Sequence, residues 1–334
     1  MLTKDNFPQS LRVDLEVAYQ EGRKAFTDRE YEALIELVPT TSSAKTEVFY
    51  GNKGRMNRFR SERQPKAFNE YKSTLTLDDW ESTISVKRQV LDDDQSGGFL
   101  RRKVEDFGMV IEREKKQGAE EYLRDGVSQV SFDKTPFFGA VHVYTDSSGA
   151  THGTVWGNVN WGGSQLDATT VQLAEKHFAE LKGDDDEVLG LRLSHLGVKR
   201  GSLNHKTARE LANSQYTIEA SSTKDNIFRG AFNIIPMDYG VGASEWYAFD
   251  LSQGDMKPVK VLTHTVSPGW GNMEYTALLE DSDTGFMRNE FMFGVFGRFD
   301  FNPGDPRVAY LHGSSSYSVT ASDLERQRVL QPNA

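Results

Sequence analysis

The apolar residues between positions 98 and 125 recur at the spacing of an α-helix. One stripe, with gaps of four, three and four positions, consists of Leu100, Val104, Phe107 and Ile111. Ser96 can cap the start of this helix, and Gly126 marks its exit. About 27 residues at about 1.5 Å each give a rod of roughly 40 Å, which is long for a compact domain. The pattern therefore predicts a spine helix on which other elements lie.

Alternating residues between positions 45 and 88 predict a long β-hairpin. One face of its last arm consists of Trp80, Ser82, Ile84 and Val86. Asp78 and Asp79 are expected at the turn from the preceding run YKSTLTL. The tip, roughly residues 52–70, has few apolar residues on either face. A hairpin that cannot bury itself is marginal unless it lies against another surface, so we expect a neighbouring subunit there.

Helical and strand patterns alternate in the middle of the chain. A helix is expected between the N-cap Asp167 and Gly183, with an apolar face made of Val171, Ala174, Phe178 and Leu181. The other elements are a strand-like run at 188–198, a short helix around 206–211 and apolar strands at 232–236 and 246–251. Such alternation predicts a compact α/β unit.

The two ends of the chain frame this unit. A short helix is expected at 9–22, and residues 128–166 form turn-rich strands. The long apolar run at 288–301 is expected to rejoin the sheet beside the spine helix. Together the patterns predict an α+β fold with an inserted middle domain.

Composition narrows the classes of function. The 334 residues, 37% of them hydrophobic, can bury one sizeable core or two modest ones. A formal net charge of -10 disfavours general binding to nucleic acid or to an anionic membrane. The absence of cysteine excludes disulfides and cysteine nucleophiles and suits a reducing cytoplasm. The sequence shows neither a signal peptide nor an apolar run of membrane-spanning length.

The best metal candidate precedes the spine helix. Its EF-hand-like positions are Asp92, Asp94, Ser96 and Gly97. Lys103, however, occupies the twelfth position, where a bidentate glutamate is needed. An acidic flank that complements the dipole of the spine helix explains this run more simply. Neither a metal nor a cofactor is therefore expected.

No catalytic arrangement stands out in the sequence. The histidines lack the close spacing of metal ligands: His142, His152, His177, His195, His205, His264 and His312. No phosphate-binding loop, dinucleotide fingerprint or nucleophile elbow occurs, and the Gly240 and Gly242 pair is too weak to indicate a nucleotide. Among 49 acidic residues chance carboxylate pairs are expected. We therefore nominate no catalytic residue and do not expect an enzyme.

One basic cluster lies on the predicted hairpin tip. Its members are Lys53, Arg55, Arg58, Arg60, Arg63 and Lys66, interleaved with Phe59. Such a stripe is what a nucleic-acid contact needs, and it is also compatible with a solvated loop. The acidic surface of a neighbouring copy is the favoured partner, because the hairpin has no core of its own and the chain is rich in carboxylates. The sequence therefore predicts an inter-subunit contact through these seven residues.

Four segments, in order along the chain, resemble the Mu-like phage major head subunits. ALIELVPTTSSAKTEVFYGNKGRMNRFRSER is similar to that family's V-P-S-T-T segment, aromatic turn and basic hairpin. STISVKRQVLDDDQSGGFLRRKVEDFG resembles the strand that leads through D-D-x-x-G into its long helix. ASEWYAFDLSQGDMKPVKVL and DTGFMRNEFMFGVFGRFDF resemble its W-Y-L-x-D segment and its F-x-R-x-E-F-x-x-G-V ending. The similarity spans roughly residues 35–312 and is loose at 141–165.

The resemblance implies the Hong Kong 97 type capsid fold. Its parts would be an N-terminal arm (1–44), an extended β-hairpin loop (45–90), a peripheral domain (91–166) with the spine helix 98–125, an axial α/β domain (167–262), return strands of the peripheral domain (263–312) and a C-terminal tail (313–334). It also implies a major capsid protein of a tailed double-stranded DNA phage, made in the bacterial cytoplasm and incorporated into the virion.

The implied partners follow from this function. They are further copies of the chain in pentamers and hexamers, a separate scaffolding protein, a portal and, as an open option, a decoration protein. Packaged double-stranded DNA would be enclosed without sequence-specific binding, and no membrane partner is implied.

Two rival interpretations remain open at this stage. An encapsulin-like nanocompartment shell would share the fold and enclose cargo enzymes. A cytoplasmic β-rich hydrolase would use Trp156, Trp161 and Trp246 as a sugar platform in an acidic cleft. Core packing explains these three scattered tryptophans more simply.

Overall fold

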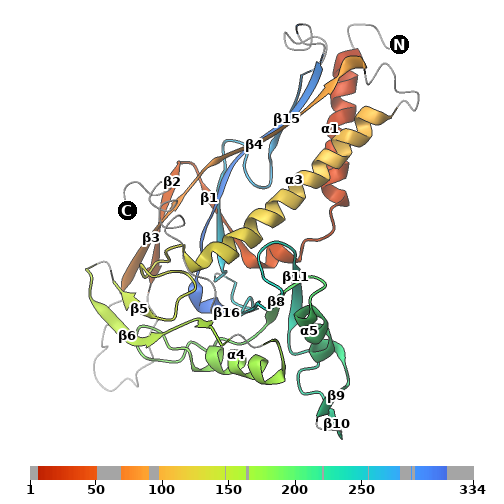
Figure 1. The fold of residues 1–334 in the computed structure, drawn as a ribbon. Coiled ribbons are helices and arrows are strands. Elements are labelled where there is room, and N and C mark those ends of the chain that lie inside the picture. Colours follow the sequence, from red (N-terminus) through yellow and green to blue (C-terminus); the bar gives the residue numbers. More distant parts are fainter. Residues whose placement is uncertain are drawn as a thin grey trace, which may run out of the picture.

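The computed structural model describes residues 7–50, 69–89, 98–146, 148–162, 165–219, 222–254, 256–278, 287 and 290–313. Figure 1 shows a long arm formed by two helices and extended strands, and a broader part that carries a second sheet at the other end of the arm. The fold is therefore α+β, as the sequence predicts.

Two helices run along the arm. α1 spans Phe7–Ala25 and α3 spans Phe99–Arg124, so both predicted helices are confirmed, the first with a few more residues at each end. The apolar stripe of α3 continues beyond the predicted residues to Ala119 and Leu123. Gly98 occupies the N-cap position of α3, and the proposed cap Ser96 lies outside the described residues.

The first sheet is built around the long strand β15 (Glu290–Pro303). β15 pairs antiparallel with three strands: β4 (Asp79–Lys87), β13 (Val259–His264) and β14 (Glu274–Leu278). β13 also pairs in parallel with β1 (Ile35–Thr40). Alternation along β15 buries one row of side chains: Phe291, Phe293, Val295, Phe299 and Phe301. The predicted return of the 288–301 run to a sheet beside the spine helix is confirmed, as Figure 1 shows.

The observed hairpin differs from the predicted one. β2 (Ala44–Tyr50) pairs antiparallel with β3 (Glu70–Thr76). β4 does not belong to the hairpin, because it pairs with β15 along its whole length. Ile84 and Val86 of β4 lie beside phenylalanines of β15 and pack against the main core, which a hairpin partner would not offer. The predicted turn at Asp78 and Asp79 therefore links two sheets and is not a hairpin turn.

The second sheet has the order β11-β8-β12-β16-β7. Its strands are β11 (Asn233–Met237), β8 (His195–Lys199), β12 (Trp246–Phe249), β16 (Ala309–His312) and β7 (Val159–Asn160). Two helices pack with this sheet, α4 (Ala168–Glu180) and α5 (Leu203–Asn213). Asp167 caps α4 through a capping box with Thr170, as the sequence predicts for this N-cap.

Two strand predictions need correction. The run at 188–198 was expected to be strand-like, but the strand β8 begins only at His195 and ends at Lys199. Gly190 has a positive φ of 71°, which interrupts the extended backbone of the run before β8. β16 lies in the second sheet beside β12, although the 263–312 segment was expected to return as a whole to the first sheet. The short 3₁₀ helix η3 (Pro306–Val308), whose start is capped by Asp305, redirects the chain between the two sheets.

Two further hairpins complete the described elements. β5 (His142–Thr145) pairs with β6 (Thr151–Trp156), and β9 (Tyr216–Glu219) pairs with β10 (Ser222–Asp225). Short 3₁₀ turns follow α1 and α3 at Glu30–Leu34 and Asp125–Val127. In Figure 1 the β9–β10 hairpin projects from the end of the second part that is remote from the arm.

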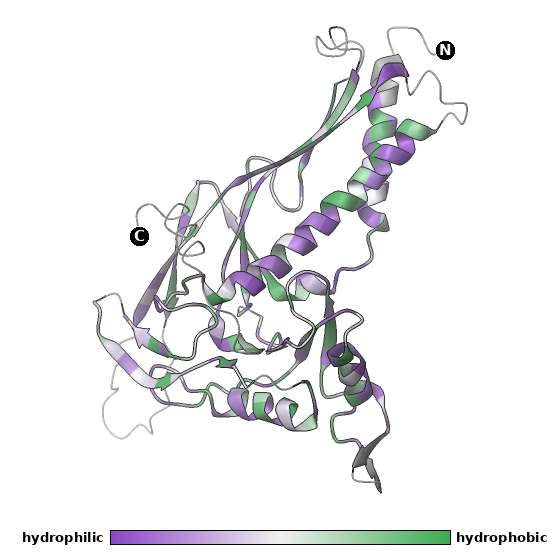
Figure 2. Ribbon diagram, in the orientation of Figure 1, coloured by the Kyte–Doolittle hydropathy of each residue, from purple (hydrophilic) through white to green (hydrophobic). Residues whose placement is uncertain are grey.

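Two main hydrophobic clusters hold these elements together. The larger one joins α1, α3 and the first sheet to one face of the second sheet, and the smaller one lies between the other face, α4 and α5. In Figure 2 hydrophobic and hydrophilic residues alternate around α1 and α3, so each helix has an apolar and a polar side. The arm and the second sheet therefore share one core.

Glycines set the distance between α1 and α3. A Cβ on Gly22 would lie 1.9 Å from the carbonyl oxygen of Glu105, and one on Gly108 would lie 2.3 Å from that of Tyr19. Both distances are shorter than any real contact allows. The two helices can therefore cross this closely only because both positions lack a side chain.

We predict that Gly22→Ala destabilises the folded chain by about 1–3 kcal/mol, because the helices must separate to admit the methyl group. The higher helix propensity of alanine, worth about 1 kcal/mol, offsets only part of this loss. Urea denaturation followed by circular dichroism measures the change. Gly254→Ala is the matched control, since nothing lies within 4 Å of a Cβ there, and a Gly22→Ala variant as stable as this control would contradict the packing argument.

Candidate assembly surfaces

The described residues do not form a metal centre. They contain no group of three or more histidine or acidic side chains that could hold an ion. The EF-hand-like positions Asp92, Asp94, Ser96 and Gly97 lie outside the described residues, and Lys103 lies within α3. Within the described part of the chain, no helix combines the length and the apolar character needed to span a bilayer.

The most buried histidine has a packing role. His142 is fully buried, and its Nδ1 lies 2.6 Å from Asp133 Oδ2, while its Nε2 lies 3.1 Å from Asn158 Oδ1. Its ring stacks on Trp156 with 4.2 Å between centroids. Trp246 is also fully buried and stacks on His312. These tryptophans therefore serve the core and do not form an open sugar platform.

The seven residues of the predicted inter-subunit contact all lie outside the described residues. These are Lys53, Arg55, Arg58, Phe59, Arg60, Arg63 and Lys66. The structure therefore places the two strands that carry them, β2 and β3, and leaves the contact itself a prediction.

The base of this hairpin packs on its own chain. Leu75 of β3 is buried with Val38 and Leu262 of the first sheet, and Phe49 of β2 stacks on Phe132 with 5.2 Å between centroids. The hydroxyl of Tyr71 donates to Asp184 at 3.0 Å. The expectation that the hairpin lacks a core of its own is therefore wrong for its base.

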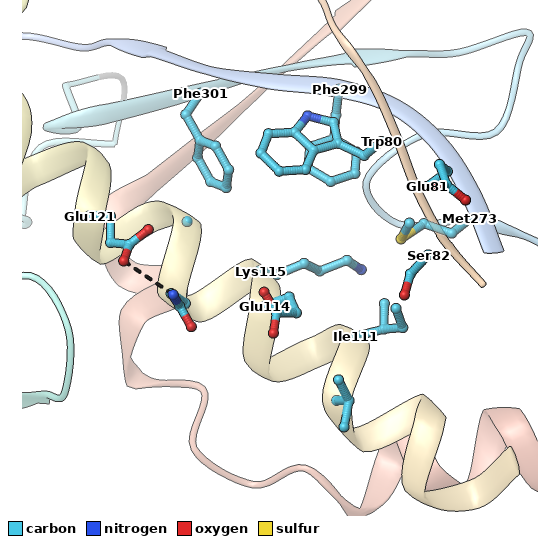
Figure 3. Close-up of a pocket in the computed structure, with 13 residues that line it drawn as sticks. Trp80, Glu81, Ser82, Ile111, Glu114, Lys115, Glu121, Met273, Phe299 and Phe301 are labelled. Carbon is cyan, nitrogen blue, oxygen red and sulfur yellow. Dashed lines mark hydrogen bonds between the residues drawn. The ribbon is translucent and has the colours of Figure 1, made fainter. Parts of the chain in front are cut away.

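A groove runs along α3 where the first sheet leaves the helix partly uncovered. Trp80 of β4 stacks on Phe299 of β15 at 5.6 Å and 6° between ring planes, and Phe301 meets the Trp80 ring edge-on. Figure 3 shows these rings above α3, with Ile111 on the helix below. The open volume is about 310 Å³, and a second hollow of about 600 Å³ continues it past Gly118. We call this the spine groove.

Carboxylates line the spine groove. They are Glu81, Glu114 and Glu121 in the first hollow, and Asp78, Asp125 and Asp300 in the second. Figure 3 shows Glu114 and Glu121 along α3, with Glu121 accepting a hydrogen bond from Gln117 at 3.1 Å. An apolar aromatic floor with an acidic rim suits a partner that carries both aromatic and cationic side chains.

Asp300 is the most perturbed carboxyl of the groove. Burial, with a smaller contribution from the neighbouring Asp78, raises its pKa to about 7, while a hydrogen bond from the backbone N–H of Phe301 opposes the shift. At neutral pH this carboxyl is therefore partly protonated, and a cation placed in the groove would favour its charged form.

Sequence reasoning missed the spine groove. Its aromatic residues were assigned to strands, and nothing in the sequence analysis brought them together with α3. The alternation RFDF at 298–301 contains the available signal, because it puts a carboxyl between two core-facing phenylalanines.

Buried ion pairs anchor the helix behind the groove. Glu112 lies 2.7 Å from Arg23 of α1 and 3.1 Å from Lys115, whose Nζ also donates to the carbonyl oxygen of Trp270 at 2.7 Å. Burial lowers the pKa of Lys115 to about 8, although Glu112 raises it. Lys115 and Arg23 hold the pKa of Glu112 below its ordinary value against the effect of burial. These contacts tie α1, α3 and the loop before β14 together.

A second ion-pair group ties α3 to the second sheet. Lys116 is buried and pairs with Asp28 and Asp238, and Arg200 pairs with the same two carboxylates, 2.5 Å from Asp28 and 2.8 Å from Asp238. Glu120 accepts the backbone N–H groups of Asp238 and of the next residue, each at 2.7 Å. Removing one partner would leave a buried charge uncompensated, which is costly.

Comparison with known proteins identifies the class of this fold. The structure is similar to a chain from the procapsid of bacteriophage JBD30, with a TM-score of 0.51 at 16% identity over 100% of this chain and 82% of that one. It is also similar to the capsid structure of the cyanophage P-SCSP1u, with a TM-score of 0.53 at 8% identity over 86% and 88% of the two chains. The fold is thus that of phage capsid proteins of the Hong Kong 97 type, as the resemblance in the sequence implied.

A family model matches the first part of the sequence. Residues 9–165 match the family described as Mu-like prophage major head subunit gpT. This part of the chain carries α1, the hairpin strands and α3, and it is similar to that family of phage head proteins. No curated protein matches the sequence.

An encapsulin is among the solved structures that are similar to this chain. The holo-SrpI encapsulin complex from Synechococcus elongatus PCC 7942 resembles this chain with a TM-score of 0.49 at 10% identity over 88% and 92% of the two chains. The family match of residues 9–165 favours the phage head over this alternative.

We predict that Asp300→Asn stabilises the isolated chain in a pH-dependent manner. The folded-state pKa of about 7 lies above the unfolded value of 3.8, so the folded state binds more protons between these values and wild-type stability falls as pH rises through this window. The variant lacks this loss. It should be more stable than the wild type by about 1–3 kcal/mol above pH 7, with the gap closing toward pH 4.

Urea denaturation across pH 4 to 8 measures this difference. Asp125→Asn, which changes a more exposed carboxylate of the same groove, is the control. A constant gap between the Asp300→Asn variant and the wild type over the whole range would refute the assignment.

Proposed function

We propose that the chain assembles into pentamers and hexamers that form the icosahedral head of a tailed phage around double-stranded DNA. The observation that carries the proposal is the match of residues 9–165 to the Mu-like major head subunits, which covers the spine helix and the hairpin strands. In this interpretation residues 1–44 are the N-terminal arm, 45–90 the extended loop, 91–166 and 263–312 the peripheral domain, 167–262 the axial domain and 313–334 a tail. The mature protein then resides in the virion.

The basic hairpin tip is proposed to contact a neighbouring copy. The six cations and Phe59 of the tip have the chemistry that the spine groove lacks, since that groove offers aromatic rings and six carboxylates. Arginine binds carboxylates bidentately and stacks on aromatic faces. The spine groove of a second copy is therefore the proposed receptor, and each copy would give one tip and receive another.

The proposed head encloses DNA and has further protein partners. With a formal net charge of -10, the wall of the shell adheres weakly to DNA, which suits loading and ejection. A separate scaffolding protein, a portal and a decoration protein are the further partners of the proposed head. Many modest contacts per copy in a closed symmetry are sufficient to make such a shell stable.

We predict that the expressed protein forms capsomers or shells, visible by negative-stain imaging and by sedimentation. Arg58→Glu combined with Arg60→Glu should raise the concentration needed for assembly about tenfold or more, because like charges then meet across the contact. The reciprocal groove variant, Glu114→Arg with Glu121→Arg, should act in the same direction. A chain that combines all four changes restores the charge match and should regain assembly.

Lys24→Glu with Arg113→Glu is the control, since both cations are exposed on α1 and α3 away from the groove lining. If the wild type stays monomeric at every concentration tried, the shell function is wrong. If it assembles and the tip variant assembles equally well, only the hairpin contact is wrong.

A further inference from the structure

A row of polar side chains crosses the first sheet beneath the hairpin. Glu36 of β1, Lys260 of β13 and Asn302 of β15 are direct partners in the strand register, so all three lie on one face of the sheet. Lys260 and Asn302 are buried, with 5% and 4% of their surface exposed. Buried polar groups are costly unless they are paired, so this row needs partners from the element that covers it. We call it the polar row.

The hairpin strands β2 and β3 cover the polar row. In their antiparallel register Glu47, Phe49, Tyr71 and Leu75 belong to one face of the hairpin. Tyr71 and Leu75 are buried, and Leu75 packs with apolar side chains of β1 and β13 next to the polar row. This face is therefore the inner one, and it brings Glu47 over the first sheet.

Lys260 binds β2 through a charge and an aromatic ring. Its Nζ donates to Glu47 and lies 3.5 Å from Glu36 Oε2. The same Nζ lies 4.5 Å from the centroid of the Phe49 ring. A buried ammonium is stable only where carboxylates or ring faces surround it, and leaving it without them is costly. Lys260 therefore determines where β2 lies on the sheet.

Asn302 binds β3 through its backbone. The side-chain Oδ1 accepts the N–H of Thr76 at 2.9 Å, and Nδ2 donates to the carbonyl oxygen of Thr76 at 2.9 Å. Because a backbone N–H only donates and a carbonyl only accepts, these two bonds allow a single orientation of the amide. Asn302 therefore fixes both the position and the direction of the chain at Thr76.

The end of the described hairpin strands that is nearest the tip is bound by the loop that follows α4. Asn69 and Tyr71 both donate to Oδ2 of Asp184, at 2.8 and 3.0 Å. The Tyr71 ring also meets Phe132 edge-on, with 5.8 Å between centroids. In Figure 1 β2 and β3 run side by side toward β5 and β6. The hairpin is thus attached at both ends of its described strands.

We propose that Lys260 and Asn302 are positioning residues that set the direction of the hairpin in the isolated subunit, with Asp184 holding its other end, so that a second copy meets a tip that is already aimed. Apolar contacts have no preferred direction, whereas ion pairs and hydrogen bonds hold the hairpin at one angle. A segment held in its bound direction loses less entropy on association. This inference rests on the proposed contact through the tip and names the residues that aim it.

Spin labels measure the direction of the hairpin. The chain has no cysteine, so Glu70→Cys with Arg113→Cys places one label on β3 and one on α3, both at exposed positions. Double electron–electron resonance on the isolated full-length subunit should give one narrow distance distribution. Lys260→Met and Asn302→Ala should each broaden this distribution, because one hairpin strand then loses its attachment to the sheet.

Two controls separate positioning from general stability. Lys260→Arg keeps a cation beside Glu47 and should keep the narrow distribution. Lys116→Met removes another buried lysine, one that pairs with Asp28 and Asp238, and should destabilise the chain without broadening the distribution. Circular dichroism confirms that each variant is folded. A distribution that stays narrow even when Lys260→Met and Asn302→Ala are combined overturns the proposal.

Assembly shows whether the preset direction matters. Lys260→Met and Asn302→Ala should each need about tenfold more protein than Lys116→Met to form shells, because the hairpin must be ordered during association. Sedimentation velocity and negative-stain imaging measure this. If both variants broaden the distribution and still assemble as the control does, the positioning role is wrong while the shell function holds. If the wild type never assembles, the shell function fails, and the label distances still decide whether these residues hold the hairpin.

Discussion

The packing of β15 on α3 is the contact on which the rest of the structure depends. Phe301 fits against the helix at Gly118, where a Cβ would lie 2.6 Å from its ring. This close approach fixes the distance between the sheet and the spine. It also determines how far Trp80 is covered, and so gives the spine groove its aromatic floor. Because β13 and β4 both pair with β15, the position of this one strand orients the first sheet as a whole.

The regular elements of the fold could be predicted from the sequence because their signals are local. The stripe of α3 and the capping residue Asp167 of α4 depend on spacing within one segment, and both are observed. The partner of β4 could not be predicted in this way. Its alternation fits any sheet, and pairing with β15, some 200 positions later in the chain, is decided by the phenylalanines that partly cover Ile84 and Val86.

The candidate sites differ in the same way, because one is contiguous in the sequence and the other is assembled from distant segments. The basic tip is contiguous in the sequence, so its charge is visible there, and its contact stays a prediction because it lies outside the described residues. The spine groove unites residues from β4, α3 and β15, and no spacing in the sequence brings Trp80, Glu114 and Asp300 together. The base of the hairpin shows the same limit, since Leu75 is buried by strands β1 and β13 that a local pattern does not reveal.

The chain order of the first sheet bears on when a subunit becomes competent for assembly. β4 ends at Lys87, and its partner β15 starts only at Glu290. About two hundred residues must therefore be synthesised after β4 before the two strands can pair. A nascent chain on the ribosome therefore has α1 available to cover α3 before β15 is made, and its spine groove has not yet formed. Contacts of such long sequence separation form late in folding. A polysome that makes this protein thus holds many unfinished copies close together, and none of them yet has the spine groove that a second copy is proposed to bind.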